Sequence, residues 1–375
     1  MSQISINERN TPEQEIGTMK RKITENGTEV VSNGTTKKHK NDVEYFLSYA
    51  DVELHRTMIE DQKRTNTYRD AIMKGAEKWI KGKVVADVGC GTGILSMFCA
   101  QAGASKVYAI EASDIGLHAK KLVEANNFND VITVLIGKAE DLELPEKVDV
   151  IVSEWMGYML LYETMLPSVL HVRDRYLKSG GKMFPERAVL HMALGETQWI
   201  TKYEESAFDF WVSLQHLYAL DMSILADHAV TKYKDTVHVH MVAQEDIMSF
   251  PTVVCDLDLY SVKAEDLAEI THEFSLSSMG NRCLNSLVLW FDVMFPEGVK
   301  LSTSPDEEDT HWQNTVLTLP DCRVKQDSLV KGTIKISQDD SYYRHLKLEL
   351  EYSVDNQEMI RRHFKMDDNC VESDS

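Results

Sequence analysis

The spacing of apolar residues changes along the chain and divides it into segments. Between Tyr45 and Ile80, apolar residues recur at mixed spacings of three and four, which predicts short helices. From Lys83 to Glu154 there are apolar runs bounded by Gly, Asp or Glu, namely KVVADVG, KVYAIEA, VITVLIG and KVDVIVSE, separated by stretches of helix length such as ILSMFCAQAGA. Strands that alternate with helices predict an α/β domain whose parallel sheet is covered on both faces.

Beyond Pro185 the pattern becomes that of β-structure. Runs such as TVHVHMV, VVCDLDLY, SLVLWFDVMF and HLKLELEYSV alternate apolar and polar residues, or are short and rich in β-branched residues. This pattern predicts an antiparallel barrel or sandwich. We therefore assign residues 41–185 to a first domain and residues 186–366 to a second.

A helical segment interrupts the β-rich half of the chain. In YEESAFDFWVSLQHLYALDMSIL the apolar residues recur at helical spacing, which predicts a helical arm over about residues 201–230. Such an apolar stripe needs a surface to pack against. It could be a buried helix within the domain, but its position inside a β-rich region favours an oligomer contact and predicts a homodimer.

The two ends of the chain have polar compositions. Residues 1–40 are rich in Ser, Thr, Asn, Gly, Glu and Lys, which predicts a disordered tail, and residues 367–375 are expected to form a frayed acidic tail. Basic clusters at residues 20–22 and 37–40 match what a nuclear import receptor reads, which predicts a nuclear location, with the cytoplasm as a second one. The alternative for both clusters is a solvated tail.

Composition excludes several classes of protein. A net charge of -20 argues against direct sequence-specific nucleic-acid binding and favours basic protein partners. The six cysteines form no CxxC pair, so neither a zinc knuckle nor a disulfide scaffold is expected. His238 and His240 share one face of a strand without an apparent third ligand, so we expect no metal. No apolar run is long enough for a bilayer, so we expect no membrane association.

The sequence DVGCGTG stands where the first strand should enter a helix. Gly89 and the glycines that follow it permit a tight turn and a close approach of the backbone to a ligand. The turn lacks the Gly-Lys-Ser/Thr of a phosphate-binding loop, and its GxGxG spacing differs from the GxGxxG that cradles pyrophosphate. These features favour a nucleoside without phosphates.

Acidic residues follow the next two predicted strands. Glu111 ends the second strand, where a carboxylate can accept both ribose hydroxyls, and Glu140 follows the third, near the expected adenine edge. A glycine-rich turn or an acidic strand end taken alone more often has a structural role. The order in which the turn, Glu111 and Glu140 follow one another along the chain, however, indicates a site for S-adenosylmethionine. Asp87 would balance its ammonium group and Arg64 would pair with its carboxylate. A surface helix charge is the alternative for Arg64.

The stretch SEWMGYMLLYE places Glu154 and Glu163 at the ends of a Met/Tyr/Leu-rich segment. Buried carboxylates are costly unless a cation or hydrogen-bond donors meet them. Since a loop after the fourth strand lies at the carboxyl edge of the sheet, we expect both glutamates to face an acceptor there. For either glutamate alone, a helix-capping or solvated role is the alternative.

Taken together, these residues resemble the type I protein arginine N-methyltransferases, most closely their arginine methyltransferase 6 branch. The resemblance covers roughly residues 43–353 and rests on YFLSY, DVGCGTG, SEWMGYMLLYE, and STSP followed by THW. It implies a Rossmann-like methyltransferase domain that uses S-adenosylmethionine. It also implies an antiparallel β-barrel domain with an inserted helical dimerisation arm, which makes a head-to-tail homodimer.

The resemblance also implies roles for particular residues. It assigns one set to the cofactor: Phe46, His55, Arg64, Asp87, Gly89, Glu111, Ala139 and Glu140. A second set is catalytic: Glu154 and Glu163 of the double-glutamate loop, with His311 of THW near Asp61. A third set shapes the substrate pocket: Tyr49, Met58, Tyr158, Met165 and Trp312. The sequence departs from the family at Cys90, where many members have Ser or Ala, although a small residue is kept.

The implied reaction transfers methyl groups to guanidinium nitrogens and gives monomethyl and asymmetric dimethylarginine. Arginine is a poor nucleophile because its charge is delocalised, and two carboxylates that bind it can restore lone-pair character to one nitrogen. Either Glu163 or the His311–Asp61 pair could accept the proton that is released. Histone tails and Arg/Gly-rich proteins are the expected substrates. A small-molecule methyltransferase and a catalytically silent adaptor for basic tails are the alternatives.

Overall fold

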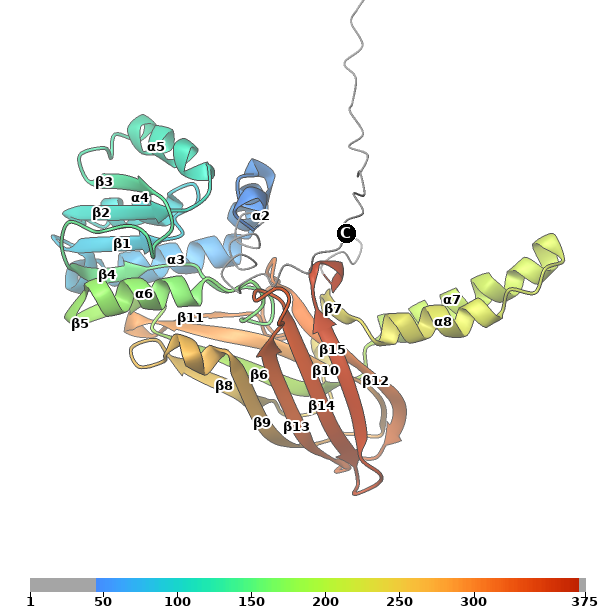
Figure 1. The fold of residues 1–375 in the computed structure, drawn as a ribbon. Coiled ribbons are helices and arrows are strands. Elements are labelled where there is room, and N and C mark those ends of the chain that lie inside the picture. Colours follow the sequence, from blue (N-terminus) through green and yellow to red (C-terminus); the bar gives the residue numbers. More distant parts are fainter. Residues whose placement is uncertain (1–44, 371–375) are drawn as a thin grey trace, which may run out of the picture.

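The structure is a computed structural model that describes residues 45–370. It contains an α/β domain, a β-barrel domain and a helical hairpin that projects from the barrel (Figure 1). The predicted polar tail with its basic clusters, and residues 371–375, lie outside the described residues. No described helix has both the length and the apolar character needed to cross a membrane.

The α/β domain is built on a parallel sheet with the strand order β3-β2-β1-β4-β5. Its helical elements are α2 (Val52–Glu60), α3 (Gln62–Lys74), η1 (Ala76–Ile80), α4 (Ile94–Gln101), α5 (Ile115–Ala125) and α6 (Leu166–Tyr176). Its strands are β1 (Val84–Val88), β2 (Lys106–Glu111), β3 (Ile132–Ile136), β4 (Val148–Val152) and β5 (Leu177–Phe184).

The position of β1 in this sheet fixes where a ligand can bind. β1 pairs with β2 on one side and with β4 on the other, so the chain changes direction across the sheet at β1. The crevice at the carboxyl ends of such strands is the place where open α/β sheets bind ligands. The glycine-rich turn after β1 and the loop after β4 therefore start side by side.

The second domain is formed by two antiparallel sheets. One has the order β7-β12-β10-β6-β8 with β11 paired to β10, and the other has the order β15-β14-β13-β9. The strands are β6 (Arg187–Gly195), β7 (Val237–His240), β8 (Thr252–Asp258), β9 (Glu269–Ser277), β10 (Arg282–Phe295), β11 (Val299–Ser302), β12 (Asn314–Val324), β13 (Leu329–Gln338), β14 (Leu346–Val354) and β15 (Ile360–Met366). Short 3-10 helices lie between some of these strands, namely η2 (Gln244–Asp246), η3 (Ala264–Leu267) and η4 (Pro296–Gly298), and η5 (Asp368–Cys370) follows β15.

Alternating burial along these strands explains why they close around a core. In β14 every second residue is buried, from Leu346 to Val354, so one face of the strand packs inward and the other faces outward. A parallel bridge between Thr236 and Lys365 brings the start of β7 to β15, and β8 lies next to β9. The two sheets therefore form the barrel that the alternation predicts.

The two domains share one hydrophobic core. It runs from the parallel sheet into the barrel, and the ring of Tyr68 on α3 meets that of Phe295 on β10 with centroids 4.8 Å apart. α3 also contacts β11. The shared core and the contacts of α3 therefore fix the position of the two domains relative to each other.

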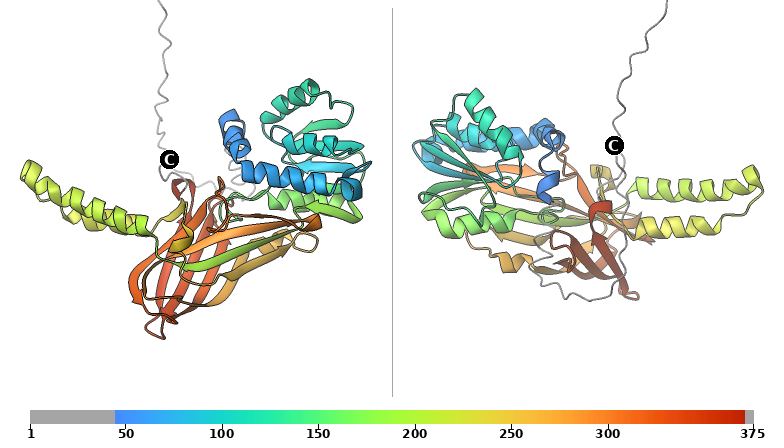
Figure 2. Two further views of the ribbon diagram at one scale, coloured as in Figure 1. Left: turned by 180° about the vertical axis from the view of Figure 1, so that it is seen from behind. Right: turned by 45° about the horizontal axis from the view of Figure 1, so that its top comes forward.

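The helical arm consists of two antiparallel helices, α7 (Gln198–Tyr218) and α8 (Ile224–Lys234), that extend away from the barrel (Figures 1 and 2). It is longer at both ends than the expected range of about 201–230. Only Ile200 and Leu214 of α7 are buried. Apolar side chains such as Phe208 and Ile224 are 51% and 80% exposed. The arm is therefore not a helix buried within its own domain, and most of its apolar stripe is left uncovered by the described residues 45–370.

Candidate active site

A cavity of about 470 Å³ lies between the carboxyl edge of the parallel sheet and the barrel. It brings together residues from the N-terminal helices, from the turns after β1, β2 and β3, from the loop after β4 and from the barrel. Most of the predicted site residues line it: Phe46, Tyr49, His55, Met58, Arg64, Gly89, Glu111, Ala139, Glu140, Glu154, Tyr158, Glu163, Met165, His311 and Trp312. Asp61 and Asp87 are not among the lining residues.

The glycine-rich turn exposes its backbone to the cavity. The amides of Gly89 and Cys90 both donate to the carbonyl of Ile110, each at 2.9 Å, which fixes the turn against β2. Gly89 has a φ of 71°, and a Cβ there would lie 2.2 Å from Cε of Met165. Only glycine fits this position, because a side chain would meet both a strained backbone and the pocket wall.

Glu111 holds the same turn from the end of β2. Its Oε2 accepts a hydrogen bond from the amide of Gly91 at 2.8 Å, and its Oε1 accepts from the amide and the hydroxyl of Ser113, also at 2.8 Å. The carboxylate is buried but lines the cavity. Glu111 is therefore rigidly oriented, as a residue that must meet two ribose hydroxyls would need to be.

Asp87 lies behind the turn and is fully buried in β1. Its Oδ2 accepts from the hydroxyl of Ser96 at 2.6 Å, whereas its Oδ1 has no hydrogen-bond partner among the described residues. Burial raises the pKa of Asp87 to about 7, although hydrogen bonds from Ser96 oppose this shift. Asp87 does not line the cavity itself, and its predicted contact with the ligand stays a prediction.

The outer part of the cavity carries the remaining cofactor candidates. Glu140 accepts a hydrogen bond from the hydroxyl of Ser168 at 2.7 Å, and Ala139 beside it is buried. Phe46 lies across from them, with Nζ of Lys138 at 5.4 Å from its ring centroid. His55 bonds the carbonyl of Tyr49 through Nε2 at 2.9 Å. The N-terminal helices therefore cover the opening above the glycine-rich turn.

The loop that carries the two glutamates is tightly folded. Gly157 donates to the carbonyl of Leu160 at 3.3 Å, and Met165 donates to the carbonyl of Trp155 at 3.0 Å, so the two ends of the loop are joined by backbone bonds. A Cβ on Gly157 would lie 1.5 Å from the carbonyl oxygen of Tyr162. This close crossing brings residues from both ends of SEWMGYMLLYE to one cavity.

Arg64 pairs with the first of these glutamates. Its Nη2 and Nε lie 2.7 and 3.1 Å from Oε2 of Glu154, and both side chains are nearly buried. Its Nη1 donates to the carbonyl of Met58 at 3.2 Å. The predicted pairing of Arg64 with the cofactor carboxylate stays a prediction, whereas the structure shows Arg64 paired with Glu154. Removing one partner of such a buried pair typically costs about 3–5 kcal/mol.

Glu163 has a different environment from Glu154. Burial raises the pKa of Glu163 to about 7; the charge of Arg344 opposes this shift and that of Asp368 adds to it. Glu163 also has a φ of 53°, held by a bond of 2.9 Å from its amide to the carbonyl of Arg344. The barrel domain therefore fixes the backbone and sets the charge of the second glutamate.

His311 reaches the site from the barrel and meets Asp61 on the N-terminal helices. Its amide and its Nδ1 lie 2.9 and 2.7 Å from Oδ2 of Asp61, and Oδ1 of Asp61 accepts from the amide of Arg64 at 2.8 Å. Burial raises the pKa of Asp61, but the hydrogen bonds from His311 and Arg64 outweigh burial and lower it. Trp312 is anchored by a bond of 3.1 Å from its Nε1 to the carbonyl of Met156. Asp61 therefore positions His311 from behind.

Several lining residues were missed from the sequence. Arg344 lies over the ring of Tyr45, with its guanidinium carbon 3.7 Å from the centroid, and Asp368 enters from the end of the chain. Residues 367–370 were expected to belong to a frayed acidic tail, but in the structure Asp368 lines the cavity and Cys370 is buried. The only sequence feature that could have indicated a site here was the pair of aspartates directly after the last strand. Their neighbours in the sequence do not indicate a site.

One cluster has the spacing of a metal site among the described residues. Glu163, His345 and Asp368 each present a ligand atom within 4.8 Å of the others. His238 and His240, by contrast, bond the backbone carbonyls of Tyr233 and Met241. The expectation that the protein uses no metal remains a prediction.

Comparison with known proteins decides the family. Residues 85–181 match the model of a methyltransferase domain, and residues 186–357 match that of the arginine methyltransferase oligomerization subdomain. The protein arginine N-methyltransferase 6 of Danio rerio is 43% identical over 91% of this chain and 99% of its own. The chain belongs to the protein arginine N-methyltransferase family.

Further relatives and solved structures agree with this assignment. The probable protein arginine N-methyltransferase 6.1 of Oryza sativa subsp. japonica is 41% identical over 84% of this chain and 87% of its own. The Trypanosoma brucei PRMT1 enzyme-prozyme heterotetramer, solved with AdoHcy, superposes with a TM-score of 0.77 at 35% identity over 85% of this chain and 100% of its own. The crystal structure of protein arginine methyltransferase 10 of Arabidopsis thaliana superposes with a TM-score of 0.76 at 30% identity. The match covers 86% of this chain and 100% of that one.

These findings confirm the predicted family, the two-domain fold and the enzyme class, an S-adenosylmethionine-dependent protein arginine methyltransferase. The second domain carries an oligomerization subdomain, which agrees with an arm whose apolar stripe is mostly left uncovered by the described residues. A small-molecule methyltransferase is accordingly disfavoured.

The tight crossing at Gly157 yields a first prediction. A Gly157→Ala variant should keep the overall fold but lose at least about 100-fold in kcat/KM, because the loop must shift to free the added methyl and small displacements of catalytic groups are that costly. Activity and thermal unfolding would be measured together. Gly280→Ala is the matched control, since a Cβ there meets nothing within 4 Å. Full activity in Gly157→Ala would show that the loop geometry is not required.

The raised pKa of Glu163 yields a second prediction. Above a pH of about 7 the side chain is a carboxylate and can bind a cation, whereas below that pH it is protonated and cannot. The kcat/KM for a basic peptide should therefore fall as the pH drops through about 7, since this parameter reports the free enzyme. A profile that stays flat down to a pH of about 5 would contradict the environment described for Glu163.

Proposed function

We propose that this chain is a type I protein arginine methyltransferase in which Glu154 and Glu163 bind the acceptor guanidinium. One observation carries the proposal: a single loop brings both carboxylates into the cavity that also exposes the glycine-rich turn. Glu154 is fixed by Arg64, whereas Glu163 is held through its backbone. Both glutamates are therefore held at the wall of the cavity that we assign to the cationic acceptor.

Two carboxylates suit this substrate for electrostatic reasons. A guanidinium is permanently charged and has five donors in one plane, so carboxylates can bind it at more than one edge. Their negative charge draws positive density away from the nitrogen that attacks. The same charge offsets the repulsion between the guanidinium and a sulfonium, so the acceptor can enter a site that already holds a cation.

The residues around the glycine-rich turn fit S-adenosylmethionine. Gly89 and Gly91 have left-handed backbones that leave room for close approach, Glu111 is oriented by the turn, and Asp87 keeps one buried oxygen without a hydrogen-bond partner. When bound, S-adenosylmethionine supplies a methyl group on an electrophilic sulfonium. The role of the protein is then to orient the acceptor nitrogen toward that methyl, and positioning of this kind contributes several kcal/mol.

We assign the released proton to Glu163. An acceptor nitrogen that takes a methyl group would have to give up one proton, while the electron pair of the broken carbon–sulfur bond would stay on the sulfur of the cofactor. Glu163 faces the cavity and has a pKa of about 7, so it can take this proton near neutral pH. Asp61 has a lowered pKa and lies behind His311, which favours a positioning role for that pair.

Asymmetric dimethylation is supported by the shape of the acceptor pocket. Met58 and Met165, with Tyr49, Tyr158 and Trp312, line the same cavity as the two glutamates. Met165 packs on Gly89, and the carbonyl of Met58 is fixed by Arg64. These side chains match the pocket positions of the type I members that the sequence resembles, and on that basis we propose asymmetric dimethylarginine as the final product.

Basic proteins are the proposed substrates. A net charge of -20 favours cationic partners such as histone tails and Arg/Gly-rich proteins. We also propose a nuclear location, from the basic clusters at residues 20–22 and 37–40, which lie outside the described residues. An adaptor without activity is less well supported, because every acidic side chain that the mechanism needs is in place.

The activity is tested by product analysis of the purified protein. Wild type with labelled S-adenosylmethionine and an Arg/Gly-rich peptide should yield monomethyl and then asymmetric dimethylarginine. Glu154→Gln and Glu163→Gln should each lower kcat by roughly 100- to 1,000-fold, as the loss of a pre-organised charge does. Glu60→Gln, an exposed change on α2, is the control. Symmetric dimethylarginine, labelled lysine, or full turnover in Glu154→Gln would refute the assignment.

The arm supports a head-to-tail homodimer as the working state. Exposed Phe208 and Ile224 should be covered by a second copy of the chain. Wild type should sediment as a dimer at micromolar concentration, and the Phe208→Asp/Ile224→Asp double variant as a monomer. Phe250→Asp, at an 81% exposed position outside the arm, should remain dimeric. A monomeric wild type would remove the proposal.

A further inference from the structure

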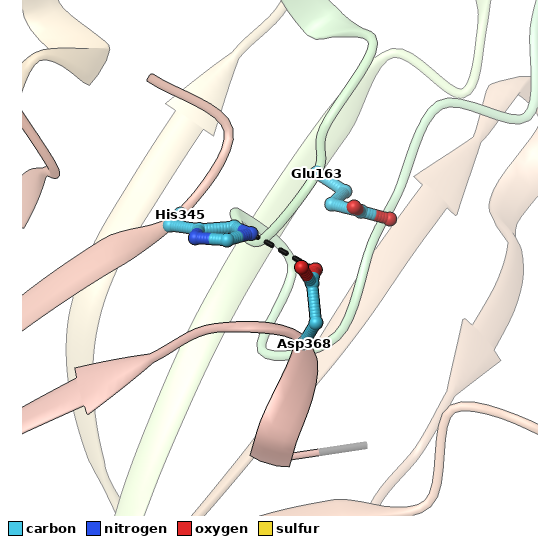
Figure 3. A group of neighbouring side chains, drawn as sticks. All are labelled: Glu163, His345 and Asp368. Carbon is cyan, nitrogen blue, oxygen red and sulfur yellow. Dashed lines mark hydrogen bonds and ion pairs between the residues drawn. The ribbon is translucent and has the colours of Figure 1, made fainter. Parts of the chain in front are cut away.

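The end of the chain places a third carboxylate at the acceptor site. After β15 the chain turns into η5, and Asp368 at its start lines the same cavity as Glu163. Figure 3 shows the carboxylate of Asp368 between the ring of His345 and the carboxylate of Glu163. The ligand atoms of these three side chains all lie within 4.8 Å of one another.

Specific contacts hold Asp368 in this place. Its Oδ1 lies 3.0 Å from Nε2 of His345 and accepts from the hydroxyl of Tyr162 at 3.3 Å. The ring of His345 is stacked between those of Tyr342 and Tyr162, at centroid distances of 4.1 and 5.7 Å. Cys370 is buried, so the segment around Asp368 is packed at both ends. These contacts point the carboxylate toward the cavity.

Asp368 keeps one oxygen available. Both of its hydrogen bonds use Oδ1, and Oδ2 has no hydrogen-bond partner among the described residues. Its side chain is 78% exposed, so a ligand that enters the cavity can reach it. The side chain of Glu163 next to it likewise makes no hydrogen bond within the described part of the chain, whereas Glu154 and Asp61 are already engaged by Arg64 and His311. Among these four acidic residues, Glu163 and Asp368 are therefore the ones that have carboxylate oxygens left to bind a ligand.

Two carboxylates this close repel each other unless a cation lies between them. The charge of Arg344 acts on Glu163, and the guanidinium of Arg344 stacks on the ring of Tyr45. An acceptor guanidinium has enough donors to meet Glu163 with one edge and Asp368 with another. A bound arginine would therefore relieve the repulsion between the two side chains.

We propose that Asp368 is an acceptor-binding residue, which accepts a hydrogen bond from the substrate guanidinium through Oδ2 and so completes the pocket formed by Glu154 and Glu163. This inference rests on the proposed function, since it takes the acceptor to be an arginine. It gives the last residues of the barrel domain a direct part in substrate binding.

The test is the Asp368→Asn variant of the full chain. Asparagine keeps an acceptor for His345 and Tyr162 but removes the charge, so the segment should stay in place. The KM for an Arg/Gly-rich peptide should rise about 10-fold, the loss expected for one charge-assisted hydrogen bond. The kcat, and the KM for S-adenosylmethionine, should change less than about twofold. A pH near 8.5 suits the assay, because Glu163 is ionised there.

Matched variants separate binding from structure. Asp340→Asn removes the same charge from a 92% exposed aspartate on the loop between β13 and β14, where it pairs with Lys347 away from the cavity, and should leave the peptide KM unchanged. Asp368→Glu restores the charge and should recover part of the affinity. Thermal unfolding of Asp368→Asn should match that of wild type within a few degrees.

Three results would overturn the inference. One is a peptide KM that does not change in Asp368→Asn although wild type makes methylarginine. This result would contradict the role of Asp368 and leave the proposed function intact. Another is an equal rise in Asp340→Asn, which would indicate general charge attraction. The third is inhibition of wild type but not of Asp368→Asn by micromolar Zn²⁺, with the peptide KM unaltered, which would make Glu163, His345 and Asp368 a metal site instead.

Discussion

The need to balance charge inside one cavity governs the architecture of this enzyme. Carboxylates withdrawn from water are costly unless a cation meets them. Glu154 has its cation within the protein, in Arg64, whereas burial raises the pKa of Glu163 to about 7. The second glutamate is therefore fully charged at neutral pH only if a further cation arrives, and in the proposed function a substrate arginine is that cation.

Each domain contributes a different part of this balance. The parallel sheet supplies the glycine-rich turn and the loop after β4, because the carboxyl ends of β1 and β4 are adjacent. The barrel supplies His311, Arg344 and Asp368, which set the orientation and charge of groups on the first domain. A single hydrophobic core runs through both domains, so it fixes the positions of these side chains relative to one another. Neither domain forms the acceptor site alone.

The arm adds a second requirement, an association that lies outside the active site. Its apolar side chains are exposed over most of α7, while its base is anchored in the barrel through Ile200. A hairpin of this kind gains its stability from the surface it covers in another chain. Catalysis and assembly thus use opposite sides of the barrel domain, one facing the sheet and the other extending away from it (Figure 2).

The sequence by itself determined the fold class and several residues of the cavity wall. Alternation of strands and helices, the change of period after Pro185, and the spacing of DVGCGTG and SEWMGYMLLYE are local patterns, and local patterns fix which groups stand at strand ends. They place Gly89, Glu111, Glu154 and Glu163 at one edge of the sheet, where the structure has them.

The tertiary structure alone decided how these groups are paired. Arg64 meets Glu154 across 90 positions, a contact that no local spacing encodes. The same holds for Asp368, which composition assigned to a loose tail and which meets His345 in the structure. Pairing across the fold depends on how the domains pack, and that packing is set by the whole core rather than by any one segment.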